Sequence, residues 1–472
     1  MKQLVLLVIM TFVTLSLHAQ RTLTLDECRK LAIQNNKELQ IAKEQINAAG
    51  YQQKAAVTKY FPQVSAQGMY MRTQKNLNLV DWDKIGGMIP QEVIGGIMSV
   101  IPEAYQPYLA ALPDKLKAAT EIDIRNLWVG DISLTQPIFT GGKIVSYNQI
   151  AKYAKELAET QNDTKLQEVV YITDETYWQV VSLANKKKLA QSYVELLQSM
   201  DSDVQKMIDE GVATKADGLS VKVKLNEAEV TLSKAENGLS LSRMLLAQIC
   251  GLPLEEEMYL SDEHLDKLPV GNQEKTTINI DEAWANRNEL KSLDYAIKIY
   301  KKQENIALSE ALPNVAFTAN YLVTNPNMFN GYRKDFDGMW TAGFVVKVPL
   351  SGWFESSFKR NSARAETLIR RLQKEDAKEK IELEVNQSVY KVNEAQKKLQ
   401  AANRNMENAG ENLRIAKFGF EEGVIPSLNL LEAQTAWVSA SSELIDSQIE
   451  VKLTETYLMK AMGTLNVPSA NE

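Results

Sequence analysis

The chain has 472 residues, and its 53 lysines and arginines against 60 aspartates and glutamates give a formal net charge of −7. This acidic balance argues against nucleic acid as a partner, because a nucleic-acid surface needs clustered positive charge. Two histidines and two cysteines argue against histidine-rich metal sites and against a disulfide framework. Cys28 and Cys250 are expected to be two buried thiols, with a single disulfide as the alternative. The sequence contains no nucleophile–histidine pairing, metalloprotease motif or phosphate loop, so we expect neither catalysis nor a cofactor or metal.

Residues 1–19 have the pattern of a secretory signal peptide. Lys2 precedes an apolar run of 14 residues, Leu4 to Leu17, and the small residue Ala19 marks the expected cleavage point. The run is shorter than the roughly 20 residues that span a membrane, which makes a membrane anchor the less favoured alternative. No cysteine stands directly after Ala19, and Cys28 lies too far from the new N-terminus, so N-terminal lipidation is not supported. An exported chain is either soluble outside the inner membrane or placed in an outer membrane as β-strands.

The rest of the sequence contains one unit twice. Residues that recur 251 positions later are Glu38 with Glu289, Pro62 with Pro313, and Tyr70 with Tyr321. Residues that recur 212 positions later are Trp128 with Trp340, Pro137 with Pro349, Gly211 with Gly423, and Gly251 with Gly463. The difference is an extra stretch in the first copy, residues 74–125. We therefore expect a first repeat at 20–252, a linker at 253–279, a second repeat at 280–464 and a C-terminal tail at 465–472.

Each copy is predicted to form a helix, two strands, a very long helix, a turn and a second long helix. The strand segments 64–70, 128–135, 315–321 and 340–348 alternate apolar with small or polar residues. This is the period, and nearly the length, of a membrane-spanning strand. The alternation alone fits equally a soluble sheet packed on helices.

Aromatic residues favour the membrane alternative. Trp128 and Trp340 begin the second strand of each pair, and Phe139 and Trp353 lie at the opposite end. Two aromatic levels one strand length apart are typical of the two interfaces of a membrane barrel. Four strands are too few to close a barrel, because small barrels need about eight, so the barrel must be shared between chains.

The long helices are predicted to pack as coiled coils. Segment 354–421 would be ~100 Å long at ~1.5 Å per residue, and its apolar residues recur at steps of three and four from Val385 to Phe420. The corresponding helix of the first copy carries a similar seam from Val180 to Ile208. Both helices end at Glu-Gly-Val, where glycine supplies the positive φ of a turn. By itself this pattern describes only the tip of an α-hairpin.

Taken together, these features resemble the TolC family of outer-membrane efflux proteins. The stretches AKFGFEEGVIPSLNLLEAQ, residues 416–434, and LTLDECRKLAIQNN, residues 23–36, carry the resemblance. It implies a mainly α fold with four strands per chain, and a homotrimer that shares a 12-stranded transmembrane β-barrel and a long α-helical coiled-coil barrel. It also implies a place in the outer membrane of a Gram-negative bacterium, extending into the periplasm.

The function that the resemblance implies is the channel component of a tripartite efflux or secretion system. Such a channel passes substrates from an inner-membrane transporter and a periplasmic adaptor protein to the outside. The adaptor would dock on the hairpin tips, which here are Gly211, Val212, Gly423 and Val424. The alternative is a soluble periplasmic coiled-coil scaffold without a channel.

The resemblance further places a pore constriction at Asp217, Asn429 and Glu432, with Phe420 as the aromatic residue before the second tip. Asn429 stands where the family has an acid, and Ile425 stands at the place of a basic gate partner. We therefore expect closure by helix packing rather than by a salt-bridge network. Three copies of Asp217 and Glu432 around one axis should raise some of their pKa values by repulsion and attract cations.

The extra stretch 74–125 falls between two strands, on the side away from the helices, and is expected to be extracellular. It is either a cap over the pore or an unordered loop. Its portion IPEAYQPYLAALPDKLKAA, residues 101–119, predicts short helices.

Overall fold

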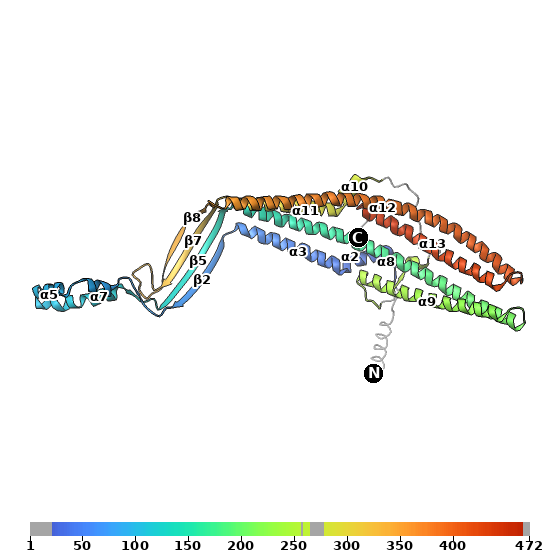
Figure 1. Ribbon diagram of the computed structural model, residues 1–472, viewed down its shortest axis with the longest axis horizontal. Coiled ribbons are helices and arrows are strands. Elements are labelled where there is room, and N and C mark those ends of the chain that lie inside the picture. Colours follow the sequence, from blue (N-terminus) through green and yellow to red (C-terminus); the bar gives the residue numbers. More distant parts are fainter. Residues whose placement is uncertain (1–20, 256–257, 265–277, 466–472) are drawn as a thin grey trace, which may run out of the picture. The chain divides into compact units, whose positions relative to one another are not determined.

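A computed structural model describes residues 21–255, 258–264 and 278–465 (Figure 1). The chain forms two units, one of Gln52–Ala151 with Tyr300–Ala365 and the other of the remaining segments, Met1–Tyr51, Lys152–Ile299 and Glu366–Glu472. Each unit thus takes segments from both halves of the sequence. The signal peptide expected at 1–19 lies outside the described residues, as do most of the linker expected at 253–279 and all but the first residue of the tail expected at 465–472.

The unit that begins at Gln52 contains one four-stranded antiparallel sheet. Its strands are β2 (Gln63–Arg72), β5 (Asn126–Phe139), β7 (Asn314–Asn325) and β8 (Asp337–Lys347), paired in the order β2-β5-β7-β8. The two strands of the first copy thus pair with each other, as do those of the second, and β5 joins β7 with Ile132 opposite Tyr321. The alternating segments of the sequence are therefore strands of a single sheet.

The extra stretch of the first copy leaves this sheet between β2 and β5. A short antiparallel ladder, β3 (Leu77–Asn78) with β4 (Glu121–Ile122), continues the two strands outward. Beyond it lie α4 (Trp82–Met88), α5 (Gln91–Val100), η2 (Glu103–Tyr105), α6 (Gln106–Ala110) and α7 (Leu112–Thr120). The prediction of short helices is confirmed, and this stretch is not an unordered loop.

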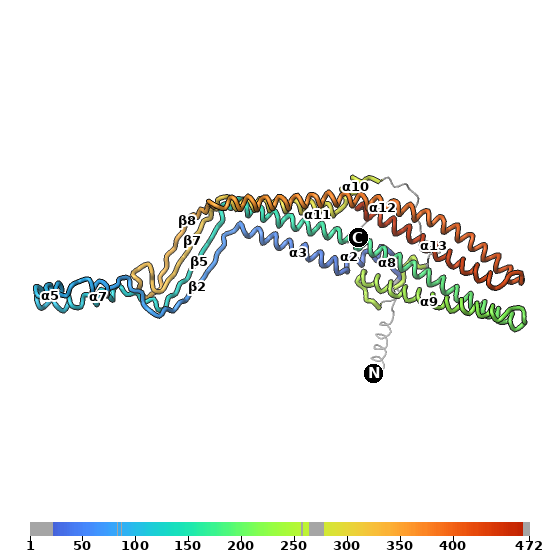
Figure 2. The backbone as a smooth tube through the Cα atoms, viewed as in Figure 1, coloured from blue at the N-terminus to red at the C-terminus, as the bar shows by residue number. Residues whose placement is uncertain are grey.

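The other unit consists of helices with a two-stranded ladder. In the first copy they are α2 (Leu25–Asn35), α3 (Lys37–Val57), α8 (Lys143–Asp209) and α9 (Lys215–Cys250). In the second copy they are α10 (Ile280–Asn286), α11 (Asn288–Ser309), α12 (Trp353–Glu421) and α13 (Ser427–Ala461). α3, α8, α11 and α12 continue into the unit that holds the sheet, where the short turn η1 (Thr58–Tyr60) follows α3. Figure 2 shows α8 with α9 and α12 with α13 as two hairpins.

The apolar seams predicted for the long helices are buried. Val194, Leu197 and Val204 of α8 form one cluster with Ala416 of α12 and Leu431 of α13. This cluster therefore joins the two hairpins near their turns. Further along α12, Val385 is completely buried in a second cluster, with Ala461 of α13. Burial of an apolar side chain contributes about 1.5–3 kcal/mol, so the seams hold the hairpins together.

The two copies end their last helices in the same way. Gly251 after α9 and Gly463 after α13 both have positive φ, +69° and +70°. A Cβ on Gly463 would lie 3.0 Å from the Cβ of Asn286, and one on Gly251 would overlap the Cβ of Asn35. Both positions require glycine because another segment passes too closely, which explains why this pair recurs in the sequence.

A buried ion pair fixes α2 to α8. Arg29 binds Asp174 with both ends of its guanidinium group, at 2.7 Å and 2.6 Å, and the Asp174 side chain is completely buried. Burial raises the pKa of Asp174, against the opposing effect of the Arg29 hydrogen bonds.

The segment after α9 is fastened to the same unit. β6 (Met258–Leu260) pairs in parallel with β1 (Arg21–Leu23), and η3 (Ser261–His264) comes directly after it. The buried carboxylate of Glu263 accepts a hydrogen bond from Arg243 of α9 at 2.7 Å. Cys28 and Cys250 are both buried and form no disulfide, and the Cys250 thiol lies 3.6 Å from the Cys28 carbonyl oxygen. Among the described residues, no helix has the length and apolarity needed to cross a membrane.

Candidate functional site: the hairpin tips and the groove behind them

The turns at the two tips have the same hydrogen bonds. Gly211 has φ +78° and Gly423 has φ +69°. Val212 donates its N–H to the Met207 carbonyl at 2.8 Å, and Val424 donates to the Gly419 carbonyl at 2.8 Å. These are the bonds that close a helix with a left-handed glycine, and a residue with a Cβ would be strained there. The repeated Glu-Gly-Val of the sequence is thus the repeated end of a helix.

The starts of the next helices differ between the two tips. Thr214 caps α9: its hydroxyl donates to Asp217 at 2.6 Å, and the Asp217 amide donates back to the hydroxyl at 3.3 Å. The hydrogen bonds from Thr214 lower the pKa of Asp217 below its usual value. α13 begins after Pro426, which provides no side-chain cap. Asp217, expected at a pore constriction, is therefore also a helix-capping residue.

Asp217 also connects the two tips. The Ser427 hydroxyl, in the first turn of α13, donates to the second carboxylate oxygen of Asp217 at 3.2 Å. A cavity of about 300 Å³ lies beside this bond, and its lining includes Phe420, Val212 and Val424. Phe420 is half-buried, whereas Val212 and Val424 are 70% and 76% exposed. The residues expected to dock an adaptor are thus close together, and two apolar side chains point outward.

The other two residues expected at the constriction are on the first turns of α13. Asn429 and Glu432 are both exposed, and Glu432 has no ion pair within the described ranges. Glu432 lines a groove of about 760 Å³ between α9 and α13, together with Leu219, Val223 and Leu428. The three apolar residues are exposed by more than half. The structure therefore places Glu432 on a groove wall and Asp217 within the tip.

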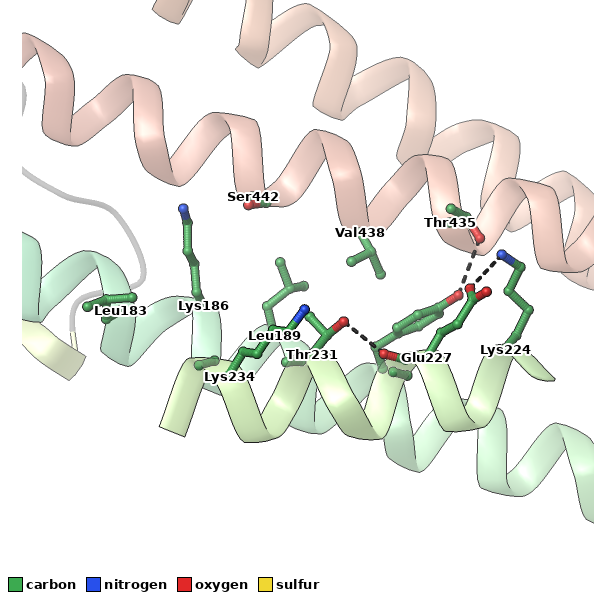
Figure 3. Close-up of a pocket in the computed structure, with 14 residues that line it drawn as sticks. Leu183, Lys186, Leu189, Lys224, Glu227, Thr231, Lys234, Thr435, Val438 and Ser442 are labelled. Atoms are coloured by element: carbon green, nitrogen blue, oxygen red, sulfur yellow. Dashed lines mark hydrogen bonds and ion pairs between the residues drawn. The ribbon is translucent and has the colours of Figure 1, made fainter. Parts of the chain in front are cut away.

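A second cavity, of about 430 Å³, lies between α8, α9 and α13 (Figure 3), and Lys224 and Thr435 line both this cavity and the groove. Its apolar residues include Leu183, Leu189 and Val438, and three lysines lie at its edges. Of these, Lys186 pairs with Asp446 at 2.7 Å and Lys224 with Glu227 at 2.8 Å. Sequence reasoning missed the groove and this cavity, because they are built from helices whose facing residues are far apart in the chain.

Three of the aromatic residues expected at membrane interfaces lie in strands of the sheet, and the fourth, Trp353, follows its last strand. The rings of Trp128 and Tyr70 are in contact, with centroids 4.4 Å apart and planes tilted by 41°, and Trp340 is paired with Tyr321 across β7 and β8. Phe139 is the last residue of β5, and Trp353 begins α12. All four of the predicted residues are exposed, between 48% and 74%.

Nothing in the described residues forms a group of His, Cys, Asp and Glu side chains that could hold a metal. The features that stand out are four antiparallel strands with exposed aromatic residues, and two long hairpins with glycine tips over a groove. These are the strands and the glycine-tipped hairpins that the sequence predicted for the two copies of its duplicated unit.

Comparison with known proteins identifies the family. The model of the outer membrane efflux protein family matches residues 28–252 and 279–464. The chain belongs to this family, as its resemblance to the TolC family indicated, and it is a protein of the outer membrane that extends into the periplasm.

Individual relatives agree with this assignment. The alkaline protease secretion protein AprF of Pseudomonas aeruginosa is 22% identical over 67% of this chain, and the match spans 66% of AprF, just under two thirds of its length. The Campylobacter jejuni CmeC outer membrane channel has the same fold, with a TM-score of 0.74 at 14% identity over 94% of this chain and 86% of CmeC. The open Neisseria gonorrhoeae MtrE outer membrane channel gives a TM-score of 0.70 at 15% identity, over 94% of this chain and 90% of MtrE.

Proposed function

We propose that three copies of this chain form the outer-membrane channel of a tripartite efflux or secretion system. The strands of the three copies make one 12-stranded barrel, and the long hairpins make a helical tunnel in the periplasm. Substrates enter from an inner-membrane transporter through a periplasmic adaptor. The family membership and the relatives that serve protease secretion or form outer-membrane channels support this function.

The sheet is the observation that carries the proposal. Its apolar side chains are exposed: Val64 of β2 is 67% exposed, Ile132 of β5 52%, and Phe344 and Val346 of β8 69% and 61%. β2 and β8 also stand at the two ends of the strand order, so each has one edge without a partner strand in the described chain. In lipid an unpaired backbone group costs several kcal/mol. Pairing of β2 of one copy with β8 of the next satisfies the open strand edges, and surrounding lipid covers the exposed apolar side chains.

Three measurements on the full chain test the channel. Membranes of cells that express it should hold the chain until detergent is added, and unheated gel samples should migrate as a trimer that heating converts to monomer. The purified trimer should conduct ions in planar bilayers. A monomer that stays in solution without detergent would overturn the proposal and favour the coiled-coil scaffold.

We assign adaptor docking to Gly211, Val212, Gly423 and Val424. The glycines shape the turns, and the two exposed valines next to the cavity between the tips offer apolar contact area that an isolated tip does not need. We assign the constriction to Asp217, Asn429 and Glu432, with Phe420 packed behind the second tip.

The docking assignment is tested with Val212→Asp and Val424→Asp together. Both side chains are exposed, so the trimer should form normally, whereas the drug tolerance of cells with this chain as their channel should fall strongly. Val230→Asp is the matched control, because Val230 is 55% exposed on α9, away from the tip. Unchanged tolerance in the double variant would refute the docking assignment.

A further inference from the structure

The extra stretch of the first copy has a firmly held base. The Thr73 amide donates to the Arg125 carbonyl at 3.1 Å, and the Leu79 amide donates to the Thr120 carbonyl at 3.0 Å. The Trp82 indole donates to the Thr120 hydroxyl at 2.6 Å. Lys334, from the connection between β7 and β8, pairs with Asp123 at 2.6 Å. The stretch is therefore anchored to both strand pairs of the sheet.

Its outer part, residues 85–111, has an unusual surface. These 27 residues contain two charged side chains, Glu92 and Glu103, and no lysine or arginine. α5, η2 and α6 contain no buried residue, and large apolar side chains are open to solvent. Val100 of α5 is 83% exposed, and Met88, the last residue of α4, is 71% exposed. Soluble surfaces rarely leave so continuous an apolar area uncovered, and such an area marks an interaction site.

The apolar residues of α5 form one face. Val93, Ile97 and Val100 recur at the spacing of a single helix side, and Gly96 lies on the same side. A Cβ on Gly96 would meet no atom of the described chain within 4 Å. A face of this kind, flat at the glycine and apolar around it, lets another helix approach closely.

The charges indicate what covers this face. Helices that lie on a lipid surface are rich in lysine and arginine, because anionic head groups attract cations. Residues 85–111 carry two acids instead. A second copy of the same apolar segment can cover the face, because packing between two apolar surfaces needs no lysine or arginine.

The point at which the stretch leaves the sheet also favours a second copy of the segment as the partner. It leaves from β2, which stands at an end of the strand order, and β2 is the strand that the proposed trimer places beside β8 of the next copy. Three copies are thereby tethered at one end of the shared sheet, where the local concentration of each segment is of the order of mM.

We propose that residues 85–111 pack against the same residues of the neighbouring copies and narrow the outer end of the channel. This inference rests on the trimer of the proposed function. It assigns an interaction surface to a stretch that the second copy lacks.

A spin label at position 97 tests the contact. Ile97→Cys is labelled in the full-length trimer in liposomes, and Asp114→Cys on the polar side of α7 is the matched control. The native cysteines are buried, so the introduced thiol is the one that reacts. The spectrum at 97 should show dipolar broadening that is lost when most labels are replaced by a diamagnetic analogue, and the spectrum at 114 should show none.

Each other result overturns the proposal. Accessibility of the label at 97 to oxygen without broadening would mean a lipid contact, and accessibility to a water-soluble nickel chelate would mean a free surface. Conductance provides a second readout: Val93→Gln with Ile97→Gln should raise single-channel conductance, and an unchanged value would contradict the narrowing. A trimer without broadening refutes this inference alone, whereas a monomer on the unheated gel refutes the proposed function as well.

Discussion

At the scale of single residues, the two tips are alike in their turns and different in the helix starts after those turns. Glycine at positive φ closes both long helices. Asp217 then accepts hydrogen bonds from Thr214 and from Ser427, whereas Asn429, its counterpart at the second tip, is exposed and comes after an uncapped start. The stability of the tip region therefore depends on the first copy more than on the second.

Asp217→Ala should loosen the start of α9 by about 1 kcal/mol, the usual contribution of a helix cap. Amide hydrogen exchange at residues 215–220 measures this change, with Asn429→Ala as the control that should leave the start of α13 unaffected. Because the pKa of Asp217 is lowered in the folded chain, its contribution is present above the ordinary value of 3.8 and is lost as pH falls through the folded value. Equal exchange in the two variants at neutral pH would contradict the capping role.

At the scale of elements, the sequence predicted most of the features that depend on residues close together in the chain. The seam of α12 and the glycine turns result from spacing and residue type, so they could be read from the chain. The hydrogen bond between Ser427 and Asp217 joins residues 210 positions apart, the groove needs α9 and α13 together, and the second cavity needs α8 as well. Such contacts depend on how the helices pack, which periodicity does not specify. For the same reason the pairing of Arg29 with Asp174 was not predicted.

The ion pair between Arg29 and Asp174 should control the stability of α2. Arg29→Met leaves the buried Asp174 carboxylate without its partner, which should cost about 3–5 kcal/mol and raise the pKa of Asp174 further. Protease resistance and hydrogen exchange protection of α2 should both fall at neutral pH. The double variant Arg29→Met, Asp174→Asn removes the buried charge and should recover much of the loss. If the double variant is no more stable than the single one, the charge is not the cause.

The pH dependence of the single variant has its origin in the same raised pKa. Asp174 in the folded chain binds its proton at a higher pH than in the unfolded chain, so stability decreases as pH rises from the ordinary value of 3.8 through the folded value. Lowering the pH should therefore restore α2 in Arg29→Met, which is the reverse of the pH effect expected at Asp217.

At the scale of the whole molecule, the strand count of the sequence indicated that one chain cannot close a barrel. The sequence did not say which strands stand at the edges. The strand order makes them β2 and β8, the first strand of the first copy and the last strand of the second. A ring of such chains would join each first copy to a neighbour's second copy, so the barrel seam would coincide with the boundary of the duplication.

The same ring would bring three copies of each acidic tip residue around one axis. Glu432 is exposed and unpaired within the described ranges, so its charge faces solvent, whereas Asp217 is held within the tip. Glu432→Gln should therefore weaken cation preference, measured as the reversal potential across a salt gradient. The change should shrink at high salt, because the screening length falls from about 10 Å at 0.1 M to about 3 Å at 1 M. Glu450→Gln is the control, since Glu450 lies further along α13 and is paired with Lys398 at 2.7 Å. Identical reversal potentials for the two variants would remove Glu432 from the constriction.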